Sequence, residues 1–135
     1  MKNSSIRAFL LTVLLLCPVG AYSEMDLSDV VPPDAKIVEV WECRDFLGSW
    51  SEVLAVASIF EGGQIGKIEV AGTAHVTQYN VDGFDRRWDF GLQEDGSFRY
   101  SFIVSPNGRA SYYDFRSSSK SVKPSITMDC RHRKG

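Results

Sequence analysis

From residue 36 onward, apolar residues of this chain recur mostly at every second position. Successive side chains of a β-strand point to opposite faces, so this alternation is the pattern of strands with one buried face. The pattern repeats in short segments that are separated by glycine-containing turns. It predicts an all-β domain built from short strands that follow one another along the chain.

The clearest two strands lie on either side of Asp95-Gly96. Their apolar faces hold Phe84, Trp88, Phe90 and Leu92 in the first segment, and Phe98, Tyr100, Phe102 and Val104 in the second. Asp-Gly between two such runs favours a tight hairpin, because glycine accepts the positive φ that the turn requires. Asp82-Gly83 and Asn107-Gly108 are similar turn signals. Sequential strands should therefore pair in an antiparallel meander.

Other segments bring the expected number of strands to seven or eight. Lys36 to Phe46, Ile65 to Tyr79, Arg109 to Arg116 and the alternating residues from Ile126 to Arg131 all read as strands. Gly72 is expected to mark a bulge or bend within the second of these. Residues 51–60 suit a strand buried on both faces, although their alanines and a serine cap also permit a short helix. The β-rich surroundings favour the strand.

The first 23 residues have the composition of a secretory signal peptide. Lys2 and Arg7 give a positive start, and an apolar run of about 12 residues follows, ending at Val19. A membrane-spanning helix needs about 20 apolar residues. We therefore expect cleavage after Ala21 or Ser23, and a periplasmic or secreted protein with no stable membrane insertion afterwards. Cys17 would be discarded with the leader.

Removal of the leader leaves two cysteines, Cys43 and Cys130, near the two ends of the β region. In an oxidising compartment this pair predicts one disulfide, with two buried free thiols as the alternative. The bond would bring the first strand within about 6 Å of the last, measured between Cα atoms. A meander whose first and last strands meet is a closed or nearly closed barrel. A β-sandwich remains the alternative architecture.

The expected organisation is one domain preceded by two short segments. Residues 1–23 form the signal peptide, and residues 24–35 form an extended lead-in because Pro32 and Pro33 favour extended backbone. Residues 36–133 then form a single β domain, which is long enough to bury a core of its own.

Charge and motifs exclude several classes of function. The whole chain carries a net charge of −2, and loss of the basic leader makes it more acidic, which argues against nucleic acid as a partner. Gly-x-Ser-x-Gly, phosphate-binding glycine loops and His-Glu-x-x-His are absent from the sequence. His75 and His132 stand apart from any group with metal-ligand spacing. We therefore expect a protein without catalytic activity, metal or cofactor.

The aromatic residues pose the main functional question. They are numerous for so short a chain: Trp41, Trp88, Phe90, Tyr100, Phe102, Tyr113 and Phe115. In a narrow barrel these side chains fill the interior, and this is the favoured interpretation. In a wider barrel they line a ligand pocket. The candidate ligand-binding residues for the second case are Trp41, Arg86, Trp88, Phe90, Tyr100 and Phe102.

The charged residues on either side of Trp88 are expected to have mainly structural roles. Arg86 is the one charge on the apolar side, where it would pair with Asp114 or Glu69, protect a sheet edge or contact an anionic ligand. Asp85 and Asp89, with Arg87 between them, have the pattern of a solvated strand face.

Two functions fit these observations. The first is an exported, non-catalytic binding module that presents a barrel mouth or a strand face to a small apolar ligand. The alternative is a protein–protein interaction element of the cell envelope or a secreted inhibitor. Inhibitors usually present a rigid exposed loop, and the loops available from the sequence are Ser117 to Pro124 and Ser105 to Gly108.

Overall fold

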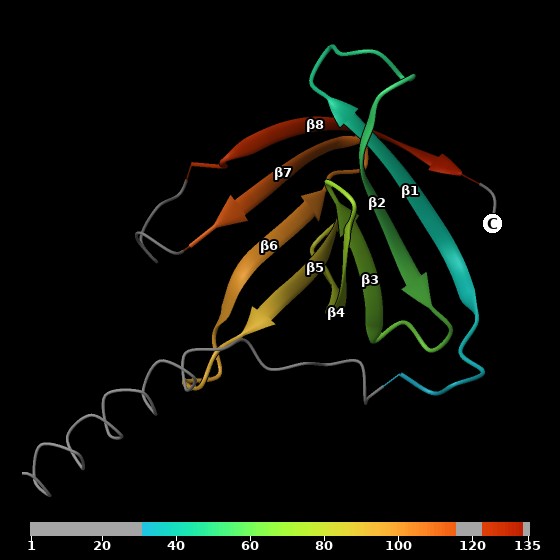
Figure 1. Ribbon diagram of the computed structural model, residues 1–135, viewed down its shortest axis with the longest axis vertical. Coiled ribbons are helices and arrows are strands. Elements are labelled where there is room, and N and C mark those ends of the chain that lie inside the picture. The colour runs from blue at the N-terminus through green and yellow to red at the C-terminus, as the bar shows by residue number, and fades with distance from the viewer. Residues whose placement is uncertain (1–30, 116–122, 134–135) are drawn as a thin grey trace, which may run out of the picture.

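The predicted antiparallel meander is confirmed, and it closes into a barrel rather than a sandwich (Figure 1). The computed structural model describes residues 31–115 and 123–133. Its strands are β1 (Ile37–Asp45), β2 (Val53–Phe60), β3 (Ile65–Val70), β4 (Thr73–Asp82), β5 (Asp85–Leu92), β6 (Phe98–Val104), β7 (Arg109–Asp114) and β8 (Ile126–Arg133). Every strand pairs with its neighbours in sequence, and β1 pairs with β8. The proposed signal peptide lies outside the described residues.

Turns join the strands largely where the sequence predicts them, with one correction. Residues 65–79 are not one strand bent at Gly72, since Ala71 and Gly72 form a two-residue turn between β3 and β4. Both residues have positive φ, 51° and 82°, which is the conformation that matches the twist of a tight hairpin. Residues 53–60 form strand β2, as favoured over a helix.

A second correction concerns Phe84, which the alternation placed on the buried face of β5. Its side chain is 87% exposed, because the residue lies in the tight turn between β4 and β5. The strand pairing begins only at Asp85, opposite Asp82. The alternation of β5 therefore applies from Arg86 onward and not to the turn before it.

Large aromatic side chains occupy the interior of the barrel. Trp88, Phe90 and Phe102 are fully buried, and the rings of Trp88 and Phe102 have their centroids 5.8 Å apart. The indole N–H of Trp88 donates a hydrogen bond of 2.9 Å to the Ser58 carbonyl oxygen on β2. A Cβ atom at Gly66 of β3 would lie 2.7 Å from the Trp88 ring, so this position requires glycine. Trp88 thus reaches from β5 to the backbone of β2 and β3.

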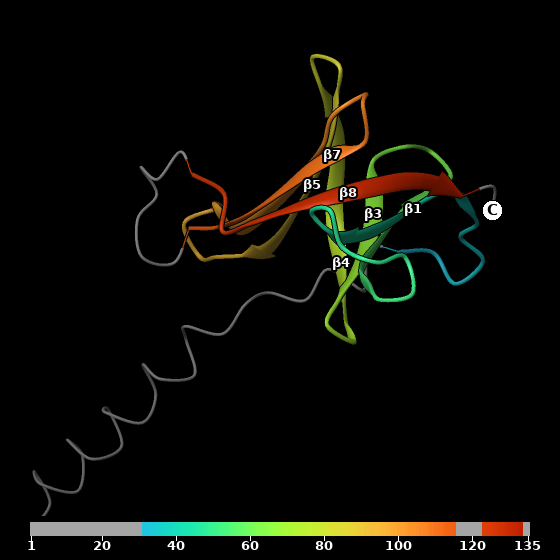
Figure 2. The same cartoon turned by 90° about the horizontal axis from the view of Figure 1, so that it is seen from above.

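A disulfide joins the two strands that close the barrel. Cys43 on β1 and Cys130 on β8 are directly paired in register, with an S–S distance of 2.04 Å and a Cα–Cα distance of 4.0 Å. In the view from above, β8 runs between β7 and β1 (Figure 2). Such a bond is compatible with an oxidising, exported environment. The described part of the chain contains no helix that is long and apolar enough to span a membrane.

Candidate binding surfaces

An ion pair spans one mouth of the barrel and involves two of the candidate ligand-binding positions. Arg86 of β5 contacts Glu39 of β1, with a distance of 2.5 Å between Nε and Oε1. The Trp41 indole donates to the same carboxylate oxygen, and the Arg86 guanidinium lies 5.1 Å from the Trp41 ring centroid. In an eight-stranded barrel, β1 and β5 lie on opposite sides. The pair therefore bridges the interior at this end.

The sequence-based partners of Arg86 are wrong. Asp114 lies 3.6 Å from Arg99 instead, and Arg86 pairs with Glu39. The reason is that β1 and β5 come together only when the barrel closes, so nothing local in the sequence indicates the contact. Because both side chains are partly exposed, solvent screens their attraction, and the pair contributes about 0–1 kcal/mol to stability.

Tyr79 lies beside this ion pair and has a perturbed phenol. It is 8% exposed, and burial raises its pKa above the ordinary value of 10.0; Arg86 lowers the pKa and Glu39 raises it by smaller amounts. The folded protein therefore holds this proton more tightly than the unfolded chain does. We expect the stability from this group to be complete below pH 10 and to be lost as the pH rises through the folded pKa.

The test is denaturant unfolding across the alkaline range. In Tyr79→Phe the loss of unfolding free energy above pH 10 should be shallower than in the wild type. Identical alkaline slopes for the two proteins would show that folding does not raise the pKa of Tyr79.

The remaining candidate ligand-binding positions belong to the hydrophobic core, with Trp88, Phe90 and Phe102 buried in it and Tyr100 packed against it. Phe90 stacks on the half-buried Tyr100 with ring centroids 4.9 Å apart, while Trp88 and Phe102 pack against each other. The described residues form pockets of ≈ 120, ≈ 570 and ≈ 250 Å³, and none of these three is lined by Trp88, Phe90 or Phe102. Of the six candidate ligand-binding residues, Trp41 and Arg86 thus lie together at one end of the barrel. The other four, Trp88, Phe90, Tyr100 and Phe102, pack in or against its core.

Tyr113 and Phe115 face outward, although the sequence analysis grouped them with the barrel-filling aromatics. Tyr112 pairs with the core residue Phe102 and packs against the core, so its neighbour Tyr113 points to the opposite face. The Tyr113 and Phe115 rings are parallel within 8°, with centroids 5.9 Å apart. They line a groove of ≈ 250 Å³, here called the outer groove, together with Arg87, Ser101 and Ile103.

Asp89 lies beside the outer groove and is not solvated as the sequence suggested. It is only 7% exposed. Its carboxylate accepts hydrogen bonds from the Ser101 hydroxyl and from Arg87 Nε, the latter at 3.0 Å. Arg87 also donates to Ser101 Oγ at 3.2 Å and lies 3.6 Å from Asp82. The reason for the burial is that Ser101 stands directly opposite Asp89 in the β5–β6 register while Arg87 folds back over it.

The β1–β2 loop, residues 46–52, is a second exposed surface. Leu47 in this loop is 77% exposed and has a φ of 59°, in the left-handed region. Its N–H donates to Asp129 Oδ2 on β8 at 3.2 Å. The next peptide is also fixed, because Gly48 N–H donates to the Asp45 carbonyl at 2.7 Å and the Gly48 carbonyl accepts from Arg44 at 2.8 Å.

Arginine side chains hold the aromatic residues of the same loop. Trp50 lies between the Arg44 and Arg131 guanidinium groups, 4.4 and 4.3 Å from its ring centroid. Arg109 lies 4.7 Å from the Phe46 ring centroid. Contacts of this kind are worth about 0.5–1 kcal/mol each at exposed sites. Contacts with residues of β1, β7 and β8 therefore stabilise the conformation of the β1–β2 loop.

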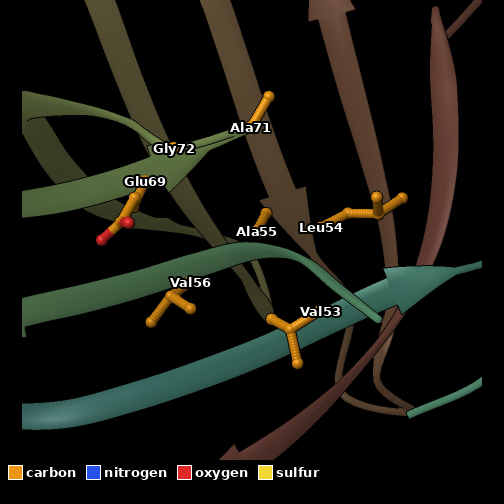
Figure 3. Close-up of a pocket in the computed structure, with 7 residues that line it drawn as sticks. All are labelled: Val53, Leu54, Ala55, Val56, Glu69, Ala71 and Gly72. Atoms are coloured by element: carbon orange, nitrogen blue, oxygen red, sulfur yellow. The ribbon is translucent and has the colours of Figure 1, made fainter. Parts of the chain in front are cut away.

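Apolar residues beside the loop extend its surface. Val53 and Leu54, at the start of β2, are exposed, as are Phe46 and Leu47. A shallow pocket of ≈ 120 Å³ lies next to them, between β2 and the β3–β4 turn (Figure 3). Its lining residues are Val53, Leu54, Ala55, Val56, Glu69, Ala71 and Gly72.

The alternating pattern of the sequence does not indicate the β1–β2 loop as a binding surface. Of the two loops expected to be available, 105–108 is the tight turn between β6 and β7, and most of 117–124 lies outside the described residues. One feature of the sequence that does indicate this loop is the apolar pair Phe46-Leu47 next to Gly48, because it interrupts the alternation at the end of a strand.

Within residues 31–115 and 123–133, no three His, Cys, Asp or Glu side chains gather in a way that could hold a metal ion. Comparisons of the chain with protein-family models, with curated proteins and with solved structures find no match.

Proposed function

We propose that this protein is an exported, non-catalytic binding module that docks a protein partner through the β1–β2 loop. One observation carries the proposal: Leu47 combines a left-handed backbone with a side chain that is 77% exposed. The left-handed conformation costs a residue with a Cβ atom about 1–2 kcal/mol, and the exposed side chain recovers little of it by burial. Strain that persists in this way is concentrated at binding and catalytic sites.

The contacts of the loop support a docking role because they fix its shape before a partner arrives. Hydrogen bonds hold the backbone at Leu47 and Gly48, and arginine side chains hold Phe46 and Trp50. A loop that is already ordered loses little conformational entropy on association, so more of the contact energy appears as affinity. Aromatic residues and arginine are also the residue types enriched at interfaces.

The expected partner is a protein that receives Leu47 in an apolar pocket. Val53 and Leu54 continue the apolar surface on one side. Acidic residues accompany the arginines beneath the loop, since Arg44 pairs with Asp129 and Arg131 with Glu42. Apolar contact rather than charge should therefore dominate the interface. The filled interior supports this function over a small apolar ligand held inside the barrel.

Leu47→Asp is expected to abolish co-purification of the partner from the native compartment. Removing a central apolar side chain from an interface costs about 2 kcal/mol or more, a loss of about thirtyfold in affinity. The measurement is the amount of partner recovered with tagged wild-type and variant proteins. Phe84→Asp is the matched control, because Phe84 is 87% exposed at the β4–β5 turn and lies outside the loop.

Leu47→Gly separates binding from folding in the same experiment. Glycine adopts the left-handed conformation without strain, so the free energy of unfolding should stay equal or rise by up to about 1 kcal/mol while the partner is lost. If the glycine variant retained the partner at wild-type levels, or if Phe84→Asp lost it equally, the loop would not be the docking site.

A further inference from the structure

We propose that the outer groove on β5, β6 and β7 binds a neutral pyranose ring of a carbohydrate. The groove lies on the outside of the barrel and is lined by Arg87, Ser101, Ile103, Tyr113 and Phe115. None of these residues belongs to the β1–β2 loop, so the site is independent of the docking function proposed above.

Two parallel aromatic rings supply one wall of the groove. Tyr113 lies on β7 and Phe115 directly follows this strand, and the planes of their rings differ by only 8°. The face of an aromatic ring carries partial negative charge. The C–H groups on one face of a pyranose carry partial positive charge and are apolar enough to lie against such a surface. Because the two rings are stacked on each other, with centroids 5.9 Å apart, it is the outer face of this stack that suits the flat face of a sugar.

The charges around the groove favour a neutral ligand over an anion. Arg87 is the cation that lines the groove, and its guanidinium contacts both Asp89 and Asp82. Its charge is thus compensated by two carboxylates before any ligand arrives. A carboxylate or phosphate ligand would have to compete with Asp89, which is largely buried and also accepts a hydrogen bond from Ser101.

Arg87 and Tyr113 have hydrogen-bond donors that could bind the hydroxyl groups of a sugar. Arg87 uses Nε and one hydrogen of Nη2 for Asp89 and Ser101, and its Nη1 faces Asp82. A guanidinium carries five N–H groups, so N–H groups of Nη1 and Nη2 are left for a ligand. The Tyr113 hydroxyl has no hydrogen-bond partner within the described ranges. Fixed planar donors beside an aromatic wall suit neighbouring hydroxyls of one ring.

The size of the groove limits the ligand to about one ring. Its volume of ≈ 250 Å³ lies just below the range of about 300–1,000 Å³ typical of pockets for drug-sized ligands. A single pyranose, free or within a longer glycan that continues outside the groove, is the ligand class that this space and lining fit.

The test is an NMR titration of the purified exported protein with the methyl glycosides of glucose, galactose and N-acetylglucosamine. We expect at least one of them to give saturable shifts at the amides of Ser101 and Tyr113, with millimolar affinity. Tyr113→Ala and Phe115→Ala should each weaken that affinity about tenfold or more, and Phe84→Ala, which removes an exposed aromatic ring elsewhere, should leave it unchanged.

Two further probes and one variant make the result decisive. Saturable shifts at these amides with tetramethylammonium or with acetate, and with none of the glycosides, would overturn the proposal in favour of a cation or an anion site. Absence of saturable shifts with all glycosides would also overturn it, as would unchanged affinity in both alanine variants. Leu47→Asp should leave the affinity for the glycoside unchanged. The proposal of partner docking at the β1–β2 loop and the proposal of sugar binding in the outer groove can therefore fail independently of each other.

Discussion

Replacing Cys43 and Cys130 together with alanine is expected to lower the free energy of unfolding by about 4 kcal/mol. The disulfide closes a loop with a sequence separation of 87 residues, and loops of this length give the larger stabilisations in the chain-entropy description. It also lies between β1 and β8, whose pairing closes the barrel. Urea unfolding of the double variant and the oxidised wild type measures the difference.

The reduced wild-type protein is the matched control for this double variant. Both lack the covalent bond, but only the variant lacks the sulfur atoms, and Cys43 is fully buried. Similar stabilities for the two would assign the loss to the bond itself. A loss below about 1 kcal/mol in the double variant would contradict the view that this bond secures the closing strand pair.

Trp88→Ala is expected to lower the free energy of unfolding by about 3–5 kcal/mol, or to prevent folding at ordinary temperature. The substitution removes a fully buried ring that contacts Phe102 and Tyr79, and it leaves the Ser58 carbonyl without its donor. The space would be difficult to refill because eight paired strands fix the wall of the barrel.

Trp50→Ala is the matched control for Trp88→Ala. It removes the same side chain from the outer surface, where Trp50 is half-buried between two arginines. Its cost should be about 1–2 kcal/mol, the worth of two exposed cation–π contacts. Trp88→Phe, which keeps a ring, should fall between the two alanine variants. Equal stabilities for Trp88→Ala and Trp50→Ala would show that the interior is not packed around Trp88.

The barrel was predictable because the sequence carries two consistent signals. Alternation marks the strands, and glycines such as Gly83, Gly96 and Gly108, which all have positive φ, mark the tight turns between them. The two cysteines then indicate which strands must meet. The β3–β4 turn was missed because alanine, at Ala71, occupies a left-handed position where asparagine or aspartate would have been recognised.

Which face of a strand lies inside was harder to predict than the strands themselves. Tyr112 and Tyr113 alternate equally well with their neighbours, and only the register of β7 against β6 places Tyr112 opposite the core residue Phe102. In a short strand with aromatic residues on both faces, the alternation has no preferred direction. The alternation alone therefore does not distinguish Tyr113 and Phe115 from interior residues.

The proposed binding surfaces depend on contacts that no local pattern in the sequence contains. The Arg86–Glu39 pair joins opposite sides of the barrel, and the contacts of the β1–β2 loop involve residues on β7 and β8 far along the chain. The outer groove likewise combines side chains from β5, β6 and β7. Sequence reasoning identified suitable residue types, but their grouping required the register of the closed sheet.

The most direct test of this account is whether the barrel interior accepts a ligand. The measurement is the thermal unfolding midpoint of the protein with palmitate, retinol and anilinonaphthalene sulfonate, each in excess. Because Trp88, Phe90 and Phe102 already occupy the interior, we expect none of these compounds to raise the midpoint. A saturable rise with any of them that persists in Tyr113→Ala and Leu47→Asp, and that comes with saturable NMR shifts at the amides of Trp88 and Phe102, would contradict the account, since it would place a ligand inside the barrel rather than on its outer surface.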